Sequence, residues 1–134
     1  MIDIVQLREI HPVLCYAPKG DTVTFEAIKR LIGAEAQKHG VPVAFSFDEI
    51  ISEEADSVIV EDCLIVYHPE HTHDYISFVF RIRRDGDSAF IIKNEYGASP
   101  RMLSTDMLTE ADKELEAEKR YYLAMRSIFE FVKC

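Results

Sequence analysis

One segment with an alternating pattern, residues 76–83, constrains the fold more than any other part of this chain. Its apolar positions are Ile76, Phe78, Phe80 and Ile82, and its intervening positions are Ser77, Val79, Arg81 and Arg83. Because successive side chains of a strand point to opposite faces of a sheet, the pattern predicts a strand with one buried face. A second strand with apolar residues at Phe90 and Ile92 follows, so the two strands are expected to form a β-hairpin.

The turn of this hairpin decides which side chains share a face. A two-residue loop at 85–86 would place Phe78 opposite Lys93, whereas a three-residue loop at 84–86 places Phe78 opposite Ile92. A one-residue slip moves every side chain of a strand to the other face, and only the second register keeps the apolar residues together. We therefore expect the three-residue loop, with its glycine in the left-handed conformation of a G1 bulge.

Two helices are expected to flank the strands. The first is predicted at residues 25–39, since Thr24 is a typical N-cap, apolar residues recur at helical spacing, and Gly40 provides a C-terminal stop. The second, at residues 106–133, is predicted to be about 40 Å long at 1.5 Å per residue. Its distal half is apolar almost all round, which predicts cover by the sheet on one side and by the first helix or a second protomer on the other.

Further strands are predicted on either side of the first helix. Residues 13–16 and 41–47 are apolar runs bounded by turn residues. Residues 58–67 are predicted to form a single long strand rather than two, because Glu61-Asp62 is a poor dipeptide for a tight hairpin. The remaining expectations are a short helix at 3–10 and an irregular acidic stretch at 48–56.

These elements predict a single α+β domain over residues 1–134. Its two layers are an antiparallel β-meander and a pair of helices, one in the N-terminal half and one long helix at the C-terminus. A chain of 134 residues can bury such a core without help from disulfides or metals. The order of elements is similar to that of helix-grip proteins of the START type, and this resemblance implies a small molecule held between a curved sheet and the C-terminal helix.

The charge of the chain is concentrated in one window. Residues 41–79 contain nine acids and no Lys or Arg, so the 15 acids outside the window balance the 15 bases of a chain with net charge −9. An excess of acids argues against binding to nucleic-acid phosphates and to anionic membrane surfaces, and we expect neither partner. Such a window favours a cation, which is a metal ion, a proton or a basic protein partner.

Three histidines lie in the run 68–74, which connects two predicted strands and is expected to be a hairpin loop. With an extended backbone between them, His71 and His73 project to one side, a spacing by which β-structure presents two imidazoles to a metal. His68 would close a three-ligand site, and Glu70 or Asp74 would supply an oxygen ligand or orient a ring. One alternative is therefore a divalent transition metal at His68, His71, His73 and Asp74, and the other is a polar loop with solvated imidazoles.

The cysteines and the missing catalytic motifs bear on location and activity. Three cysteines without CxxC or paired spacing indicate reduced thiols and a cytoplasmic protein. No apolar stretch approaches the ~18–20 residues of a membrane span, and the N-terminal residues lack the pattern of a signal peptide. The sequence has no GxSxG, HExxH, P-loop or GxGxxG motif, so we expect a non-enzymatic protein.

The favoured hypothesis is an interaction or ligand-binding domain that self-associates through its C-terminal helix. The expected homodimer surface comprises the apolar residues of the distal half of that helix, namely Tyr121, Met125, Ile128, Phe129 and Val132. A basic protein partner for the acidic window is a further expectation. The basic counterpart within the chain comprises Arg81, Arg83, Arg84, Lys93 and Arg101, and it would favour contacts between copies.

Overall fold

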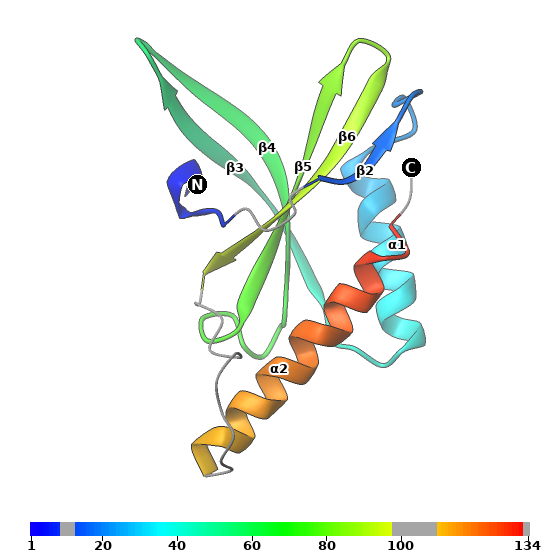
Figure 1. Cartoon of the computed structure of the whole chain (residues 1–134), viewed down its shortest axis with the longest axis vertical. Coiled ribbons are helices and arrows are strands. Elements are labelled where there is room, and N and C mark those ends of the chain that lie inside the picture. The colour runs from blue at the N-terminus through cyan, green and yellow to red at the C-terminus, as the bar shows by residue number, and fades with distance from the viewer. Residues whose placement is uncertain (9–12, 98–109, 133–134) are drawn as a thin grey trace.

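Six strands and two long helices make up the fold in the computed structural model (Figure 1), which describes residues 1–8, 13–97 and 110–132, with the backbone alone for 110–115. In chain order the elements are β1 (Ile2–Asp3), the 3-10 helix η1 (Ile4–Gln6), β2 (Val13–Ala17), α1 (Phe25–Lys38), β3 (Ala44–Glu54), β4 (Ser57–Tyr67), β5 (Ile76–Asp85), β6 (Ser88–Gly97) and α2 (Glu110–Phe129). The strands form one sheet in the order β1-β3-β4-β5-β6-β2. The α+β prediction is confirmed, although the sheet is mixed because β1 runs parallel to β3.

The sheet is split into two diverging hairpins. β3 and β4 pair along their whole length, from Glu54 opposite Ser57 to Ala44 opposite Tyr67. Between β4 and β5, by contrast, only Leu64 to Val66 find partners among the described residues. Beyond this short contact the β3–β4 and β5–β6 hairpins separate, and they form the two arms of a V (Figure 1).

The two helices lie near each other against the sheet (Figure 1). α1 begins as predicted, because the Thr24 hydroxyl oxygen accepts a hydrogen bond from the Ala27 N–H at 3.1 Å. It ends near Gly40, whose φ of +67° lies in the left-handed region. The described part of α2 spans Glu110–Phe129, and the predicted start of that helix at residue 106 lies outside the described residues.

Apolar side chains cover both faces of the central strands. On the helix face, Phe129 of α2 packs edge-on against Phe78 and Phe80 of β5, with ring centroids 4.8 and 5.2 Å apart. The opposite face carries a second, smaller cluster of buried residues, formed by Ile2, Ile50, Cys63 and Val79. The N-terminal residues therefore form a partial third layer, which the two-layer prediction did not include.

The register of the β5–β6 hairpin differs from the predicted one. Asp85 pairs with Ser88 across a two-residue turn, and Gly86 is left-handed there, with φ +59°. Phe78 consequently lies opposite Glu95, so the predicted pairing with Ile92 is wrong. The prediction assumed one buried face, but Val79 on the other face is also fully buried. Apolar residues of β6 could therefore lie on either face without loss of burial.

The remaining predictions divide between confirmed and wrong. The single long strand β4 is confirmed, as is the strand at β2. The acidic stretch 48–56 is not irregular, because β3 continues through it to Glu54. Of the helix predicted at 3–10, the described residues 3–8 contain only the three residues of η1, and residues 9 and 10 lie outside the described residues. Cys63 is a buried free thiol as expected, but Cys15 is disulfide-bonded, so the prediction of reduced thiols is wrong at that position.

Candidate functional site

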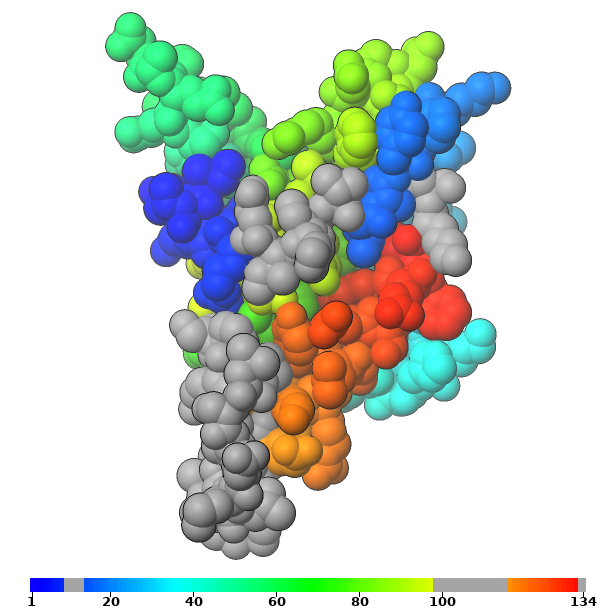
Figure 2. Space-filling model, viewed as in Figure 1, coloured from blue at the N-terminus to red at the C-terminus, as the bar shows by residue number. Residues whose placement is uncertain are grey.

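The distal part of the β3–β4 hairpin, residues 49–62, projects from the body of the molecule and is called the acidic arm below (Figure 2). It carries no Lys or Arg, and its acids are Glu49, Glu53, Glu54, Asp56, Glu61 and Asp62. A tight turn ends the arm, and Ala55 in this turn has a φ of +52°. The arm is thus a two-stranded ribbon with a uniformly negative charge.

One face of the arm is apolar and exposed. Cross-strand partners share a face, and Ile51 lies opposite Val60 while Glu53 lies opposite Val58. Val58 is 62% exposed and Val60 is 50% exposed. Phe47 extends the same face towards the body of the molecule and is itself 54% exposed. This arm face therefore combines an aliphatic and aromatic stripe with acids on its margins.

The acids of the arm face have little compensation within the chain. Glu49 lies directly opposite Asp62, and like charges at such positions destabilise a sheet. Among the described residues, the only Lys or Arg side chain that pairs with an arm acid is Arg81, whose Nη1 lies 3.6 Å from Glu61. The negative potential of the arm is therefore available to an external cation.

Below the arm, Asp48 is compensated locally. Its carboxylate accepts a hydrogen bond from the Glu49 N–H at 2.8 Å and lies 3.0 Å from the amino group of Met1. These two contacts lower the pKa of Asp48. The adjacent Cys63 is fully buried, and burial together with the charge of Asp48 raises the pKa of its thiol to about 11. This thiol is therefore protonated at neutral pH and behaves as a small apolar side chain.

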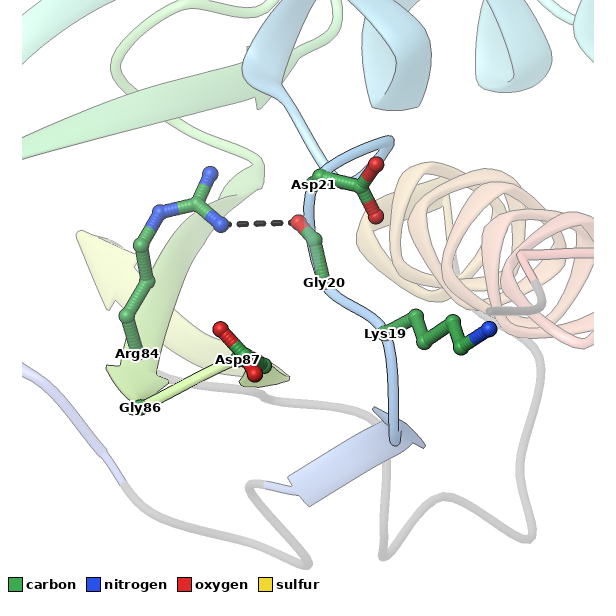
Figure 3. A pocket seen from close by; sticks show the side chains of 6 residues that line it. All are labelled: Lys19, Gly20, Asp21, Arg84, Gly86 and Asp87. Atoms are coloured by element: carbon green, nitrogen blue, oxygen red, sulfur yellow. Dashed lines mark hydrogen bonds between the residues drawn. The ribbon is translucent and has the colours of Figure 1, made fainter.

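Arg84, a member of the predicted basic counterpart, is engaged within the chain. Its guanidinium donates to the carbonyl oxygen of Gly20 at 2.8 Å (Figure 3). It also donates to the carbonyl oxygen of Val23 at 2.6 Å. The hollow beside it has a volume of about 480 Å³ and is lined by Lys19, Gly20, Asp21, Arg84, Gly86 and Asp87. Two acids and two bases balance each other there, so this hollow has no preference for one sign of charge.

The other members of the basic counterpart are also largely occupied. Arg81 is 2% exposed, and its Nε donates to the Asn94 side-chain oxygen at 3.0 Å. The Lys93 ammonium lies 5.2 Å from the Phe129 ring centroid, and burial lowers its pKa. Arg83 is exposed, and Arg101 lies outside the described residues. The acidic arm therefore faces solvent while most of the described basic counterpart is used inside the molecule.

A hollow of about 310 Å³ lies where the two hairpins diverge. It is lined from both hairpins and from the start of α1, by Thr24, Phe25, Glu61, Asp62, Ile82 and Arg84. Figure 2 shows the open notch between the arms above this point. The acidic arm thus borders a recess as well as an exposed face.

The histidine loop packs as an aromatic cluster. His71 stacks on Tyr75 with ring centroids 3.8 Å apart, and its Nδ1 lies 2.9 Å from the Asp74 carboxylate. His68 packs edge-on against His71 and Tyr121, and its Nδ1 accepts from the Glu70 N–H at 3.0 Å. Burial, followed by the neighbouring His71, lowers the pKa of His68. These contacts explain the two rings without a ligand.

The predicted metal site is not assembled by these contacts. His73 turns to a different hollow, of about 260 Å³, which it lines with Tyr75 and Tyr96 among others. Within residues 1–8, 13–97 and 110–132 there is no group of three His, Cys, Asp or Glu side chains placed to hold a metal ion. Metal binding at His68, His71, His73 and Asp74 therefore stays a prediction without a geometry to support it.

The residues expected to form a dimer surface are buried within one chain. Tyr121, Met125, Ile128, Phe129 and Val132 are each 7% exposed or less and belong to the main core with residues of the sheet and α1. The first helix and the sheet thus account for the apolar character that suggested a second protomer. These five side chains do not form an exposed surface, while self-association by another route stays a prediction.

The space between helices and sheet offers little room for a ligand. The hollow bounded by α1, Ile91 and Val132 has a volume of about 80 Å³, whereas small-molecule pockets usually measure ~300–1,000 Å³. A ligand held between the sheet and the C-terminal helix, as the helix-grip resemblance implies, therefore has no cavity of matching size at this place among the described residues.

Comparison of the chain with protein-family models, with curated proteins and with solved structures found no match. No helix within the described residues is long and apolar enough to cross a membrane. Sequence reasoning identified the acidity of the arm, but it missed the exposed apolar face and the recess beside it. The run Val58-Ile59-Val60 was the available signal, because three β-branched residues in a row place apolar side chains on both faces of a strand.

Proposed function

We propose that this chain is a non-enzymatic binding domain whose acidic arm docks on a basic protein partner. The observation that carries the proposal is the arm face, where exposed Val58 and Val60 adjoin Glu53 and Asp62, neither of which pairs with a Lys or Arg among the described residues. An exposed apolar patch rimmed by charge is typical of a protein-interaction site. Uniform negative charge selects a basic partner and speeds the encounter with it.

A second copy of the chain is a poorer partner for the arm. Arg81, Arg84 and Lys93 are held by contacts inside the molecule and offer little free positive charge. Two arms that met would bring like charges together, which costs free energy. The metal-site and helix-grip hypotheses have no described geometry in their favour, so a basic protein is the partner that best fits the charges on the surface.

Binding to a basic strand-forming peptide tests this function. The probe is a short fluorescent peptide of alternating Lys and Val, and its affinity is measured by anisotropy as a function of salt. Replacing Glu53→Lys and Asp62→Lys together converts two attractions into repulsions, and we expect affinity to fall about tenfold or more. Affinity for the unchanged protein should also fall as salt rises, because exposed charges are screened.

The matched control reverses the same amount of charge away from the arm. Glu26→Lys with Glu130→Lys changes two exposed acids on the helical side of the molecule and should leave affinity within about threefold. A peptide of alternating Glu and Val should not bind. Equal weakening by both double variants would mean that the peptide senses net charge alone, and the arm would then not be the site.

A further inference from the structure

Within the part of the chain that the structure describes, one edge of β4 has no strand beside it along the acidic arm. β3 occupies the other edge over the full length of β4, whereas β5 is paired with Leu64, Ile65 and Val66 alone. From Ser57 to Cys63, no strand within the described residues pairs with this second edge. The edge faces the notch between the two hairpins (Figure 2).

The turn of the hairpin fixes which backbone groups lie on this open edge. Glu54 and Ser57 flank a two-residue turn, so they form a hydrogen-bonded pair across the hairpin. Hydrogen-bonded and non-hydrogen-bonded pairs alternate in an antiparallel ladder. Val58, Val60 and Asp62 therefore direct their N–H and C=O groups away from β3, into the notch. Leu64 continues the same alternation, and it lies where β4 reaches β5.

The open edge lacks most of the features that protect exposed strands. Native edges are blunted by Pro, Lys, bulges or short length, because unpaired backbone groups attract other strands. This edge is regular over its length, contains no proline, and has three successive exposed β-branched residues from Val58 to Val60. Its charged residues, Glu61 and Asp62, repel an acidic strand and attract a basic one.

We propose that an extended basic segment of the partner adds to the sheet as a strand beside β4. The proposal rests on the proposed function, from which it takes the sign of the partner's charge. Alternate side chains of such a strand would lie beside Val58, Val60 and Asp62, so apolar residues and Lys or Arg in alternation fit the edge. The recess of about 310 Å³ at the base of the notch receives the end of that segment.

The same charges disfavour a second copy of the chain as the occupant. Two β4 edges paired with each other would set one acidic arm, with its six acids, against another. We therefore expect no edge-to-edge dimer at low salt. Sedimentation of the free protein at low and high salt measures this directly, and a dimer at low salt that Val60→Pro abolishes would make the second copy the occupant and overturn the proposal.

Two substitutions of one residue separate strand addition from side-chain docking. Val60→Pro removes an N–H that points into the notch and takes no part in the β3 ladder. Val60→Thr keeps that N–H and a β-branched shape. With the Lys–Val peptide as probe, we expect Val60→Pro to weaken binding about tenfold or more, and Val60→Thr to stay within about threefold of the unchanged protein.

Two further measurements use the unchanged protein, in case Val60→Pro fails to fold. A Lys–Val peptide with N-methyl groups on alternate residues cannot complete the ladder, and it should bind about tenfold more weakly than the plain peptide. Amide hydrogen exchange at Val58, Val60 and Asp62 should slow when the plain peptide is bound. Strand addition would be overturned if the exchange rates of these three amides stayed the same and the plain and N-methylated peptides bound with equal affinity.

The outcomes for the two proposals are distinct. If Val60→Pro and the methylated peptide bind normally while Glu53→Lys/Asp62→Lys does not, strand addition is wrong and the proposed function stands. If Glu53→Lys/Asp62→Lys also leaves the affinity for the plain peptide unchanged, the proposed function is wrong, and the proposal of strand addition is wrong with it.

Discussion

Replacing Phe129 by alanine tests whether the distal half of α2 is core or interface. Phe129 is 2% exposed, and its ring meets Phe78 and Phe80 edge-on at 4.8 and 5.2 Å. Truncating a buried Phe to Ala costs about 3–5 kcal/mol, and aromatic pairs add about 0.5–1.5 kcal/mol beyond the buried area. Two such pairs place this site at the upper end of the range, so we expect a loss of about 5 kcal/mol in the free energy of unfolding.

The assay is urea denaturation followed by circular dichroism at two protein concentrations. Leu123→Ala, at a 46% exposed position of the same helix, is the matched control and should cost less than about 1 kcal/mol. The midpoint for Phe129→Ala should not depend on protein concentration, because the lost contacts lie within one chain. A concentration-dependent midpoint, or equal effects of the two substitutions, would refute the assignment of Phe129 to the core.

Three further predictions concern single residues. The pKa of His68 is lowered in the folded state, so the unfolded state takes up a proton at a higher pH than the folded state does. Stability should therefore fall as pH drops below about 6.5, and it should stop falling once pH is below the folded pKa. In thermal melts at a series of pH values, His68→Phe should show a weaker pH dependence. Ala55→Gly should raise the unfolding free energy by about 1 kcal/mol, because it relieves a left-handed alanine, and a loss in urea denaturation would contradict this. Gly20→Ala should cost about 1–3 kcal/mol, since the new Cβ would lie 2.5 Å from that of Ala89. An unchanged melting midpoint for Gly20→Ala would contradict this prediction, because it would mean that the β2–α1 loop moves to avoid the clash at no cost in stability.

The parts of the fold that depend on local rules could be predicted from the sequence. The N-cap at Thr24 and the left-handed Gly40 fix both ends of α1 through contacts within a few residues, and the structure contains both. Likewise, Glu61-Asp62 is a poor dipeptide for a tight turn, and β4 continues through it. Such features need no knowledge of what packs against them.

The prediction of the hairpin register was wrong because the register depends on the burial of a second sheet face, which the sequence pattern does not show. The pattern around Phe78 is compatible with one buried face, but residues 1–8 cover the other face of the sheet near Val79. Lys93 and Glu95 then lie on the helix side, where the Tyr122 hydroxyl donates to the Glu95 carboxylate. No sequence pattern indicates that charged residues such as Lys93 and Glu95 lie on the helix side of the sheet.

The candidate site was predicted only in its charge. The stretch 48–56 lacks regular alternation because the outer part of the hairpin is exposed on both faces, so nothing marks it as a strand. Its open edge depends on how far β4 and β5 stay together, which is a long-range property of the sheet. Met125 and Phe129 show the converse case, since a helix apolar all round has the same pattern whether its cover is α1 or a second chain.

The N-terminal residues link the two hairpins. Ile2 pairs with Ile50 of β3, and six residues later Arg8 exchanges two backbone hydrogen bonds with Glu95 of β6, at 2.8 and 3.1 Å. Six residues span at most about 20 Å when fully extended, so this strap limits how far the arms can swing apart. A partner would then meet an opening of set width, and the entropy lost on binding would fall mainly on the incoming segment.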